Sequence, residues 1–118
     1  MKTTKEKGAE AERIAEKFYQ SLGHSVLARN YRIPSGEIDL VLINDRIFEL
    51  VFVEVKSRKV FPEGEAWEPY WKEKKRKLRT AMRSFLNRYP EYGPAEMRLE
   101  IVYVTQGRVS QCFDGGFF

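Results

Sequence analysis

Four charged residues lie inside two apolar stretches near the middle of the chain. Glu37 and Asp39 belong to the run GEIDLVLI, and Glu54 and Lys56 belong to the run LVFVEVK. A charge without a partner in an apolar environment loses several kcal/mol of hydration free energy. Charged residues at these positions therefore indicate either paired ions or a chemical function.

Both stretches have the length and the β-branched content of strands. We expect strands over about 37–43 and 48–57, joined by a short turn. Because side chains alternate along a strand, Ile38 and Leu40 should share the face opposite Asp39. This alternation decides which charged side chains can meet.

The length of the turn decides whether Asp39 and Glu54 come together. An even-numbered loop places them opposite each other, or one pair apart, on the same side of the sheet, whereas an odd-numbered loop without a bulge separates them. Two carboxylates on directly opposed strand positions repel each other. Mg²⁺ would compensate, because it is usually held by one or two carboxylates with water and phosphate oxygens. Lys56 shares the face of Glu54 and could orient a metal-bound water or stabilise charge on a phosphate oxygen.

The spacing of these residues thus fits metal-assisted phosphodiester hydrolysis. It fits equally an ordinary carboxylate–lysine ion pair on a solvated sheet face, which antiparallel sheets often have.

Helix and strand patterns flank the two central strands. A capping box formed by Thr3 and Glu6 precedes an apolar stripe with helical spacing, and this helix should end at Gly23. The further elements are expected as a strand at about 25–28, an irregular loop at 60–70, a helix at about 71–88 and two strands within 98–113. The order αβββαββ predicts an α/β fold with a mixed central β-sheet flanked by helices.

Length and composition restrict the class of protein. The 118 residues suffice for one hydrophobic core, so a single domain over 1–118 is expected. The net charge of +4 permits a polyanionic partner without requiring one. The single cysteine, Cys112, excludes an intramolecular disulfide and is interpreted as a buried small hydrophobe in a reducing compartment. Without a membrane-spanning run or a secretory signal, a cytoplasmic protein with no membrane partner is expected.

The most basic segment lies at the start of the second expected helix. Six of the eight residues in KEKKRKLR, from Lys72 to Arg79, are positively charged. Cations at a helix N-terminus oppose the helix dipole, which favours a role in phosphate binding, although a solvated helix face is the alternative. Trp67, Tyr70 and Trp71 could stack on bases or pack on the core as a lid. The residues expected to contact nucleic acid are Lys74, Lys72, Lys75, Arg76, Arg58 and Arg32.

Several segments together resemble one group of nucleases. GEIDL and FVEVKSR resemble the PD-(D/E)xK signature of restriction-endonuclease-like enzymes, with Asp39 as the first acid and Glu54, Val55 and Lys56 as the ExK element. Over nearly its whole length the sequence is similar to the YraN family, through GAEAERIAEKFYQSLGHSVLARNYR, KEKKRKLRTA and RLEIVYV. The sequence departs from the wider signature at Ile38, where the proline of the motif is missing.

The resemblance implies a restriction-endonuclease-like fold and a site for Mg²⁺ or Mn²⁺. Lys56 would position or activate the attacking water, and Lys74, which matches the family's lysine in this helix, would contact a phosphate. The residues implied at the metal are Asp39, Glu54, the Val55 carbonyl and, on the first helix, Glu12.

Residue pattern and resemblance together predict a metal-dependent endonuclease that hydrolyses DNA phosphodiester bonds, with branched DNA in repair or recombination as one substrate. Cleavage of both strands would favour a homodimer. Two alternatives stay open. One is a catalytically inactive nucleic-acid-binding module of the same fold, and the other is a protein-binding adaptor that uses the aromatic loop and Phe117-Phe118.

Overall fold

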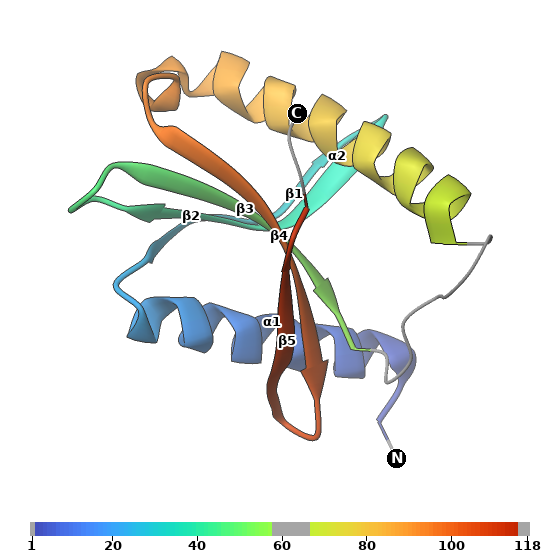
Figure 1. Cartoon of the computed structure of the whole chain (residues 1–118). Coiled ribbons are helices and arrows are strands. Elements are labelled where there is room, and N and C mark those ends of the chain that lie inside the picture. Colours follow the sequence, from blue (N-terminus) through green and yellow to red (C-terminus); the bar gives the residue numbers. More distant parts are fainter. Residues whose placement is uncertain (1, 58–66, 116–118) are drawn as a thin grey trace.

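The computed structural model describes residues 2–57 and 67–115 (Figure 1). The αβββαββ order is confirmed. β1 continues to Ile33 instead of ending near Ala28, because a tight turn at Pro34-Ser35 lets it pair with β2 along its length. The elements are α1 (Thr4–Ser21), β1 (Ser25–Ile33), β2 (Gly36–Asn44), β3 (Glu49–Lys56), α2 (Trp67–Arg88), the 3₁₀ turn η2 (Pro90–Tyr92), β4 (Glu96–Thr105) and β5 (Arg108–Asp114).

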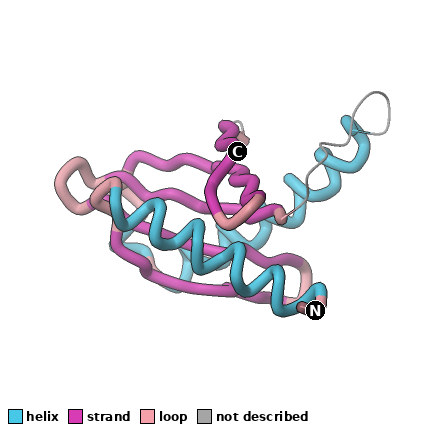
Figure 2. Tube along the Cα trace, turned by 90° about the horizontal axis from the view of Figure 1, so that it is seen from below, coloured by secondary structure: helices cyan, strands magenta, loops and turns pink. Residues whose placement is uncertain are grey.

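The five strands form one mixed sheet in the order β1-β2-β3-β4-β5. All neighbours are antiparallel except β3 and β4, which are parallel. A parallel pair needs a long crossover connection, and α2 is the helix within it. The two helices cover opposite faces of the sheet, α1 below and α2 above in Figure 1, and the view from below in Figure 2 shows α1 lying along the strands. This arrangement confirms the expected α/β fold and is consistent with a restriction-endonuclease-like fold.

α1 covers one face of the sheet through a stripe of residues spaced by four. Its first turn is capped by Thr3, whose Oγ1 accepts the Glu6 N–H at 3.1 Å, so the predicted cap is confirmed. Ala11, Ala15 and Tyr19 are buried on the inner side. The strand residues packed with them are Leu40, Leu42, Val51, Val53, Val102 and Val104.

α2 covers the other face and closes on the β1–β2 turn. Its buried residues pack against inward residues of the three central strands, including Val41 and Phe52. A side-chain carbon at Gly36 would overlap the Lys77 carbonyl oxygen, so the turn lies directly against the α2 backbone. The inner face of α2 consists of Leu78, Ala81, Met82 and Phe85.

One stretch of β2 breaks the predicted alternation. Ile38 packs on the α2 face with Val41, whereas Leu40 packs on the α1 face, so the expectation that Ile38 and Leu40 share a face is wrong. The cause lies across the ladder. Asn30, whose neighbours pair with Ile38 and Leu40, has a left-handed backbone with φ of 50°. A left-handed residue twists a strand locally, and here the twist occurs opposite Asp39.

Cys112 also differs from its expected environment. It lies on β5, the edge strand of the sheet, and is exposed, which corrects the interpretation of a buried hydrophobe. Within the residues that the structure describes, neither helix combines the length and the hydropathy needed to cross a bilayer.

Candidate active site

Asp39 and Glu54 meet where the β2–β3 ladder ends. The last ladder pair is Leu40 with Val53, so the next step along both strands places Asp39 opposite Glu54. Asp39 Oδ2 accepts the Val55 N–H at 2.7 Å, and its side chain thus lies between the two strands. Odd residues of β2 pair with even residues of β3, as the even-numbered hairpin requires. The arrangement in which the two acids come together is therefore the one that this fold adopts.

Glu54 is an almost fully buried carboxylate with 4% of its surface exposed. One oxygen, Oε1, lies 3.3 Å from Lys56 Nζ and 3.1 Å from Lys74 Nζ, so cations from β3 and α2 converge on a single atom. The other oxygen, Oε2, is buried and has no hydrogen-bond partner within the described residues. A buried carboxylate oxygen of this kind is costly unless a further ligand satisfies it.

Asp39 is strongly affected by its surroundings. Burial raises its pKa to about 7, and the neighbouring Glu54 charge adds to this effect, whereas the Val55 N–H lowers the pKa. The Glu12 charge also raises the pKa, and that of Lys74 lowers it. A carboxyl that ionises near neutral pH is typical of sites where a bound cation or a proton completes the charge balance.

Glu12 of α1 approaches the same two strands from the other face. Its side chain is half-buried, burial raises its pKa, and interaction with the side chains of Asp39 and Asn30 opposes that rise. The left-handed Asn30 thus holds the first helix and the irregular part of the sheet together. The structure gives Glu12 a contact with Asp39, and a direct contact with a metal stays a prediction.

The residues present fit a small divalent cation. Among the described residues, no three His, Cys, Asp or Glu side chains form a metal-binding group. The fit therefore rests on two carboxylates, Asp39 and Glu54, and on the buried Glu54 Oε2 that lacks a partner. Mg²⁺ is commonly bound by one or two carboxylates and completed by water and phosphate oxygens, so this donor set suits it. The Val55 carbonyl stays a predicted third protein ligand.

The residues predicted to bind nucleic acid divide into three groups. Lys74 points to Glu54, at the centre of the candidate site. Arg32 and Arg76 are exposed and form ion pairs with the acids closest to them, Glu37 at 3.3 Å and Glu73 at 2.7 Å. In the third group, Lys72 is exposed and Lys75 is half-buried on α2, and Arg58 lies outside the described residues. The side chains of Trp67 and Tyr70, and Phe117-Phe118, also lie outside the described part of the chain.

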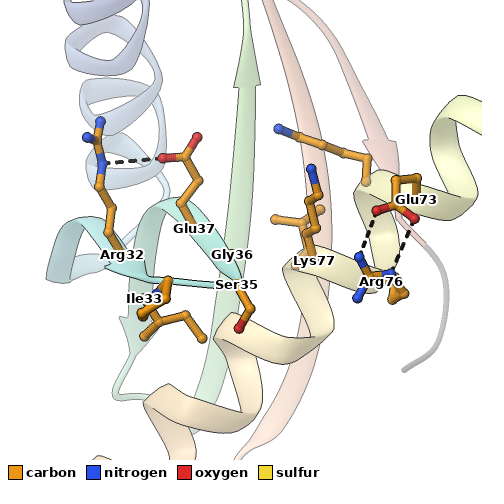
Figure 3. A pocket seen from close by; sticks show the side chains of 11 residues that line it. Arg32, Ile33, Ser35, Gly36, Glu37, Glu73, Arg76 and Lys77 are labelled. Atoms are coloured by element: carbon orange, nitrogen blue, oxygen red, sulfur yellow. Dashed lines mark hydrogen bonds and ion pairs between the residues drawn. The ribbon is translucent and has the colours of Figure 1, made fainter.

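A groove of about 700 Å³ adjoins this site, between the β1–β2 turn and α2. Figure 3 shows Arg32 and Glu37 on one wall and Lys77 on the other. Lys74 also lines the groove, so one side chain belongs to both the groove and the Glu54 cluster.

Sequence reasoning missed this groove. The basic run that contains Lys77 is apparent in the sequence, but local patterns do not indicate that the turn at Ser35 and Gly36 lies opposite it. The signal available was Gly36 itself, since a glycine at a strand start often marks a close approach of two backbones.

Comparison with known proteins identifies the chain's relatives. The family model described as "Uncharacterised protein family UPF0102" matches residues 11–104. UPF0102 proteins of Psychrobacter sp. (strain PRwf-1) and Saccharophagus degradans are 40% and 38% identical to it, each over 88% of this chain and over 77% and 86% of their own lengths. The UPF0102 protein of Paracidovorax citrulli is 40% identical over 97% of this chain and 87% of its own. The chain belongs to the UPF0102 family, which is the YraN family that its motifs predicted.

Proposed function

We propose that this protein is a nuclease that hydrolyses DNA phosphodiester bonds with Mg²⁺ or Mn²⁺. The observation that supports it most is the environment of Glu54. This carboxylate is buried opposite Asp39 in the strand register, two lysines contact one of its oxygens, and the other oxygen lacks a partner. A purely structural ion pair would not need a second carboxylate beside it.

Asp39 and Glu54 would hold the metal, together with the Val55 carbonyl. When bound, the ion would supply Lewis acidity to a phosphate oxygen and lower the pKa of a bound water. Asp39 is oriented for this role by the Val55 N–H, which fixes its Oδ2 between the strands. Glu12 would act through Asp39 as a positioning residue, because its half-buried carboxyl interacts with that side chain from the α1 side.

The two lysines would act on the phosphate and on the attacking water. Lys56 lies on the same face of β3 as Glu54, 3.3 Å from its Oε1, where an ammonium can orient a water or donate a proton to a phosphate oxygen. Lys74 reaches the same oxygen from α2. Two cations close to the scissile phosphate would stabilise the negative charge that develops there in the transition state.

The DNA backbone would lie over the basic start of α2. Lys72, Lys74, Lys75 and Arg76 occur there within five consecutive residues, and Arg32 follows across the groove. Phosphate contacts of this kind are independent of sequence and weaken as the salt concentration rises. We therefore expect binding that depends strongly on ionic strength.

One observation favours a second candidate, an inactive binding module. Lys56 and Lys74 neutralise Glu54 without any metal, so the cluster is partly satisfied as it stands. In that case the basic surface would bind DNA and the buried ion pairs would only stabilise the fold.

Cleavage assays on two variants separate the candidates. Labelled linear, nicked and branched DNA would be incubated with Mg²⁺, Mn²⁺ or EDTA and the wild type, Glu54→Gln or Lys56→Met. The nuclease proposal expects metal-dependent cleavage by the wild type and a loss of about a hundredfold or more in each variant, with DNA binding retained. Glu16→Gln, which alters a carboxylate of α1 paired with Arg29 of β1, is the matched control. DNA binding without cleavage under any metal condition would favour the module.

A further inference from the structure

The groove between the β1–β2 turn and α2 combines two kinds of surface. Ile33 and Pro34 contribute apolar atoms beside the turn, and the rims are charged. Its four cationic side chains outnumber its two acidic ones, Glu37 and Glu73. The volume of about 700 Å³ falls within the range of about 300–1,000 Å³ that is usual for pockets binding a small organic group.

The charges in the groove are not all used within the protein. Each of the two acids forms an ion pair with an arginine, Arg32 with Glu37 and Arg76 with Glu73. Lys77, exposed on the α2 wall, makes no ion pair in the part of the chain that the structure describes. The groove therefore carries a net positive charge, with a cation directed to the solvent beside apolar surface.

This mixture suits one form of nucleic acid better than another. A double helix presents phosphates on its outside and keeps the faces of its bases stacked, so apolar surface gains little from it. An unpaired strand exposes base faces, which bind apolar or planar groups, while its phosphates pair with cations. A groove with apolar atoms between basic rims fits the unpaired strand.

The groove also adjoins the candidate active site. Lys74 lines it and at the same time contacts Glu54, and the β2 start at Glu37 forms its other wall two residues before Asp39. A strand lying in the groove would place its neighbouring phosphate at the Asp39–Glu54 pair.

From these observations we infer that the groove binds an unpaired stretch of DNA next to the scissile phosphate. The preferred substrate is then a single strand, or a duplex with a single-stranded flap, rather than a fully paired duplex. This inference rests on the proposed nuclease function for its link to cleavage. The binding site itself can be tested without any cleavage.

Binding is measured first, in EDTA, by fluorescence anisotropy with a short single strand, a flapped duplex and a blunt duplex of matched sequence. The wild type should bind the two substrates with unpaired ends about tenfold more tightly than the blunt duplex. Lys77→Glu and Ser35→Glu, at exposed positions on opposite walls, should each weaken single-strand binding by about tenfold. Arg83→Glu, an equal charge reversal at an exposed α2 position outside the groove, should change it by about twofold or less.

Three results would overturn the inference. They are equal affinity of the wild type for the single strand and the blunt duplex, a loss of single-strand binding in Arg83→Glu as large as in the groove variants, or a loss of blunt-duplex binding in the groove variants as large as their loss of single-strand binding. Circular dichroism of each variant verifies that the fold is retained. A parallel cleavage assay with Mn²⁺ separates the two proposals. Groove-dependent binding without cleavage supports this inference and contradicts the nuclease function, whereas cleavage confined to the blunt duplex supports the nuclease and contradicts this inference.

Discussion

Replacing Asp39 with asparagine should stabilise the metal-free protein at alkaline pH. Burial and the neighbouring Glu54 charge raise the pKa of Asp39 from 3.8 to about 7. A carboxyl whose pKa is higher in the folded state favours folding while it is protonated. This contribution is fully present below pH 3.8 and is lost as the pH rises through 7. At pH 9 the folded wild type therefore carries an unfavourable charge that Asp39→Asn removes.

The size of the effect follows from the difference in pKa. A change from 3.8 to about 7 corresponds to at most about 4 kcal/mol, at 1.36 kcal/mol for each pH unit. Solvent reaches part of the half-buried side chain, so about 2 kcal/mol is the expected gain at pH 9. Asparagine keeps a carbonyl oxygen that can accept the Val55 N–H, so this hydrogen bond need not be lost.

Urea denaturation in EDTA, followed by far-ultraviolet circular dichroism at pH 5 and pH 9, measures this difference. Asp39→Asn should be more stable than the wild type by about 2 kcal/mol at pH 9 and by less than half of that at pH 5, where only the unfolded-state carboxyl has ionised. Glu16→Gln serves as a control of opposite sign. The hydrogen bond from Arg29 lowers the pKa of Glu16, so that this carboxylate stabilises the fold above pH 4.5 and loses its contribution in acid. A destabilised Asp39→Asn at pH 9, or a difference that does not vary with pH, would refute the reasoning.

Three further predictions concern other parts of the molecule. At pH 8, Mg²⁺ at a hundred times its dissociation constant should raise the unfolding free energy of the wild type by about 2.7 kcal/mol and leave Glu54→Gln unchanged in a thermal or urea titration; equal stabilisation of both would place the ion elsewhere. Gly36→Ala should lower the unfolding free energy by about 1–3 kcal/mol because its Cβ would overlap the Lys77 carbonyl, whereas Gly8→Ala, with open space in α1, should raise it by up to about 1 kcal/mol; the reverse order in urea denaturation would contradict the described turn. Tyr19→Phe removes the 2.6 Å hydrogen bond that the buried hydroxyl donates to Glu100 and should lower the unfolding free energy by about 1.5–3 kcal/mol. An unchanged unfolding free energy in urea denaturation would contradict this hydrogen bond.

The order of the elements could be predicted from local patterns. The Thr3 cap, the apolar stripe of α1 and the central hairpin each depend on residues close together in the chain, where helical and strand periodicity restrict the side chains directly. The same is true of the acids. Once the hairpin loop is even-numbered, strand register alone places Asp39 opposite Glu54.

Contacts between distant segments could not be predicted in this way. In the sequence, Lys74 follows the end of β3 by eighteen residues and the end of β2 by more. Only the packing of α2 on the sheet brings its Nζ to 3.1 Å from Glu54 Oε1. The contact between Glu12 and Asp39 depends similarly on how α1 lies across the strands. Exposure of Cys112 follows from the position of β5 at the sheet edge, which the sequence of that strand does not specify.

The sequence by itself determined the family and the order of helices and strands, and it left two arrangements for the acids, together on one side of the sheet or on opposite faces. Tertiary structure alone decided that Ile38 turns to the α2 face, that two lysines share one oxygen of Glu54, and that a groove opens beside them. The reason is physical. Periodicity and register act between neighbouring residues, whereas a left-handed Asn30, a turn packed against a helix backbone and a shared ion pair exist only once separate elements have packed together.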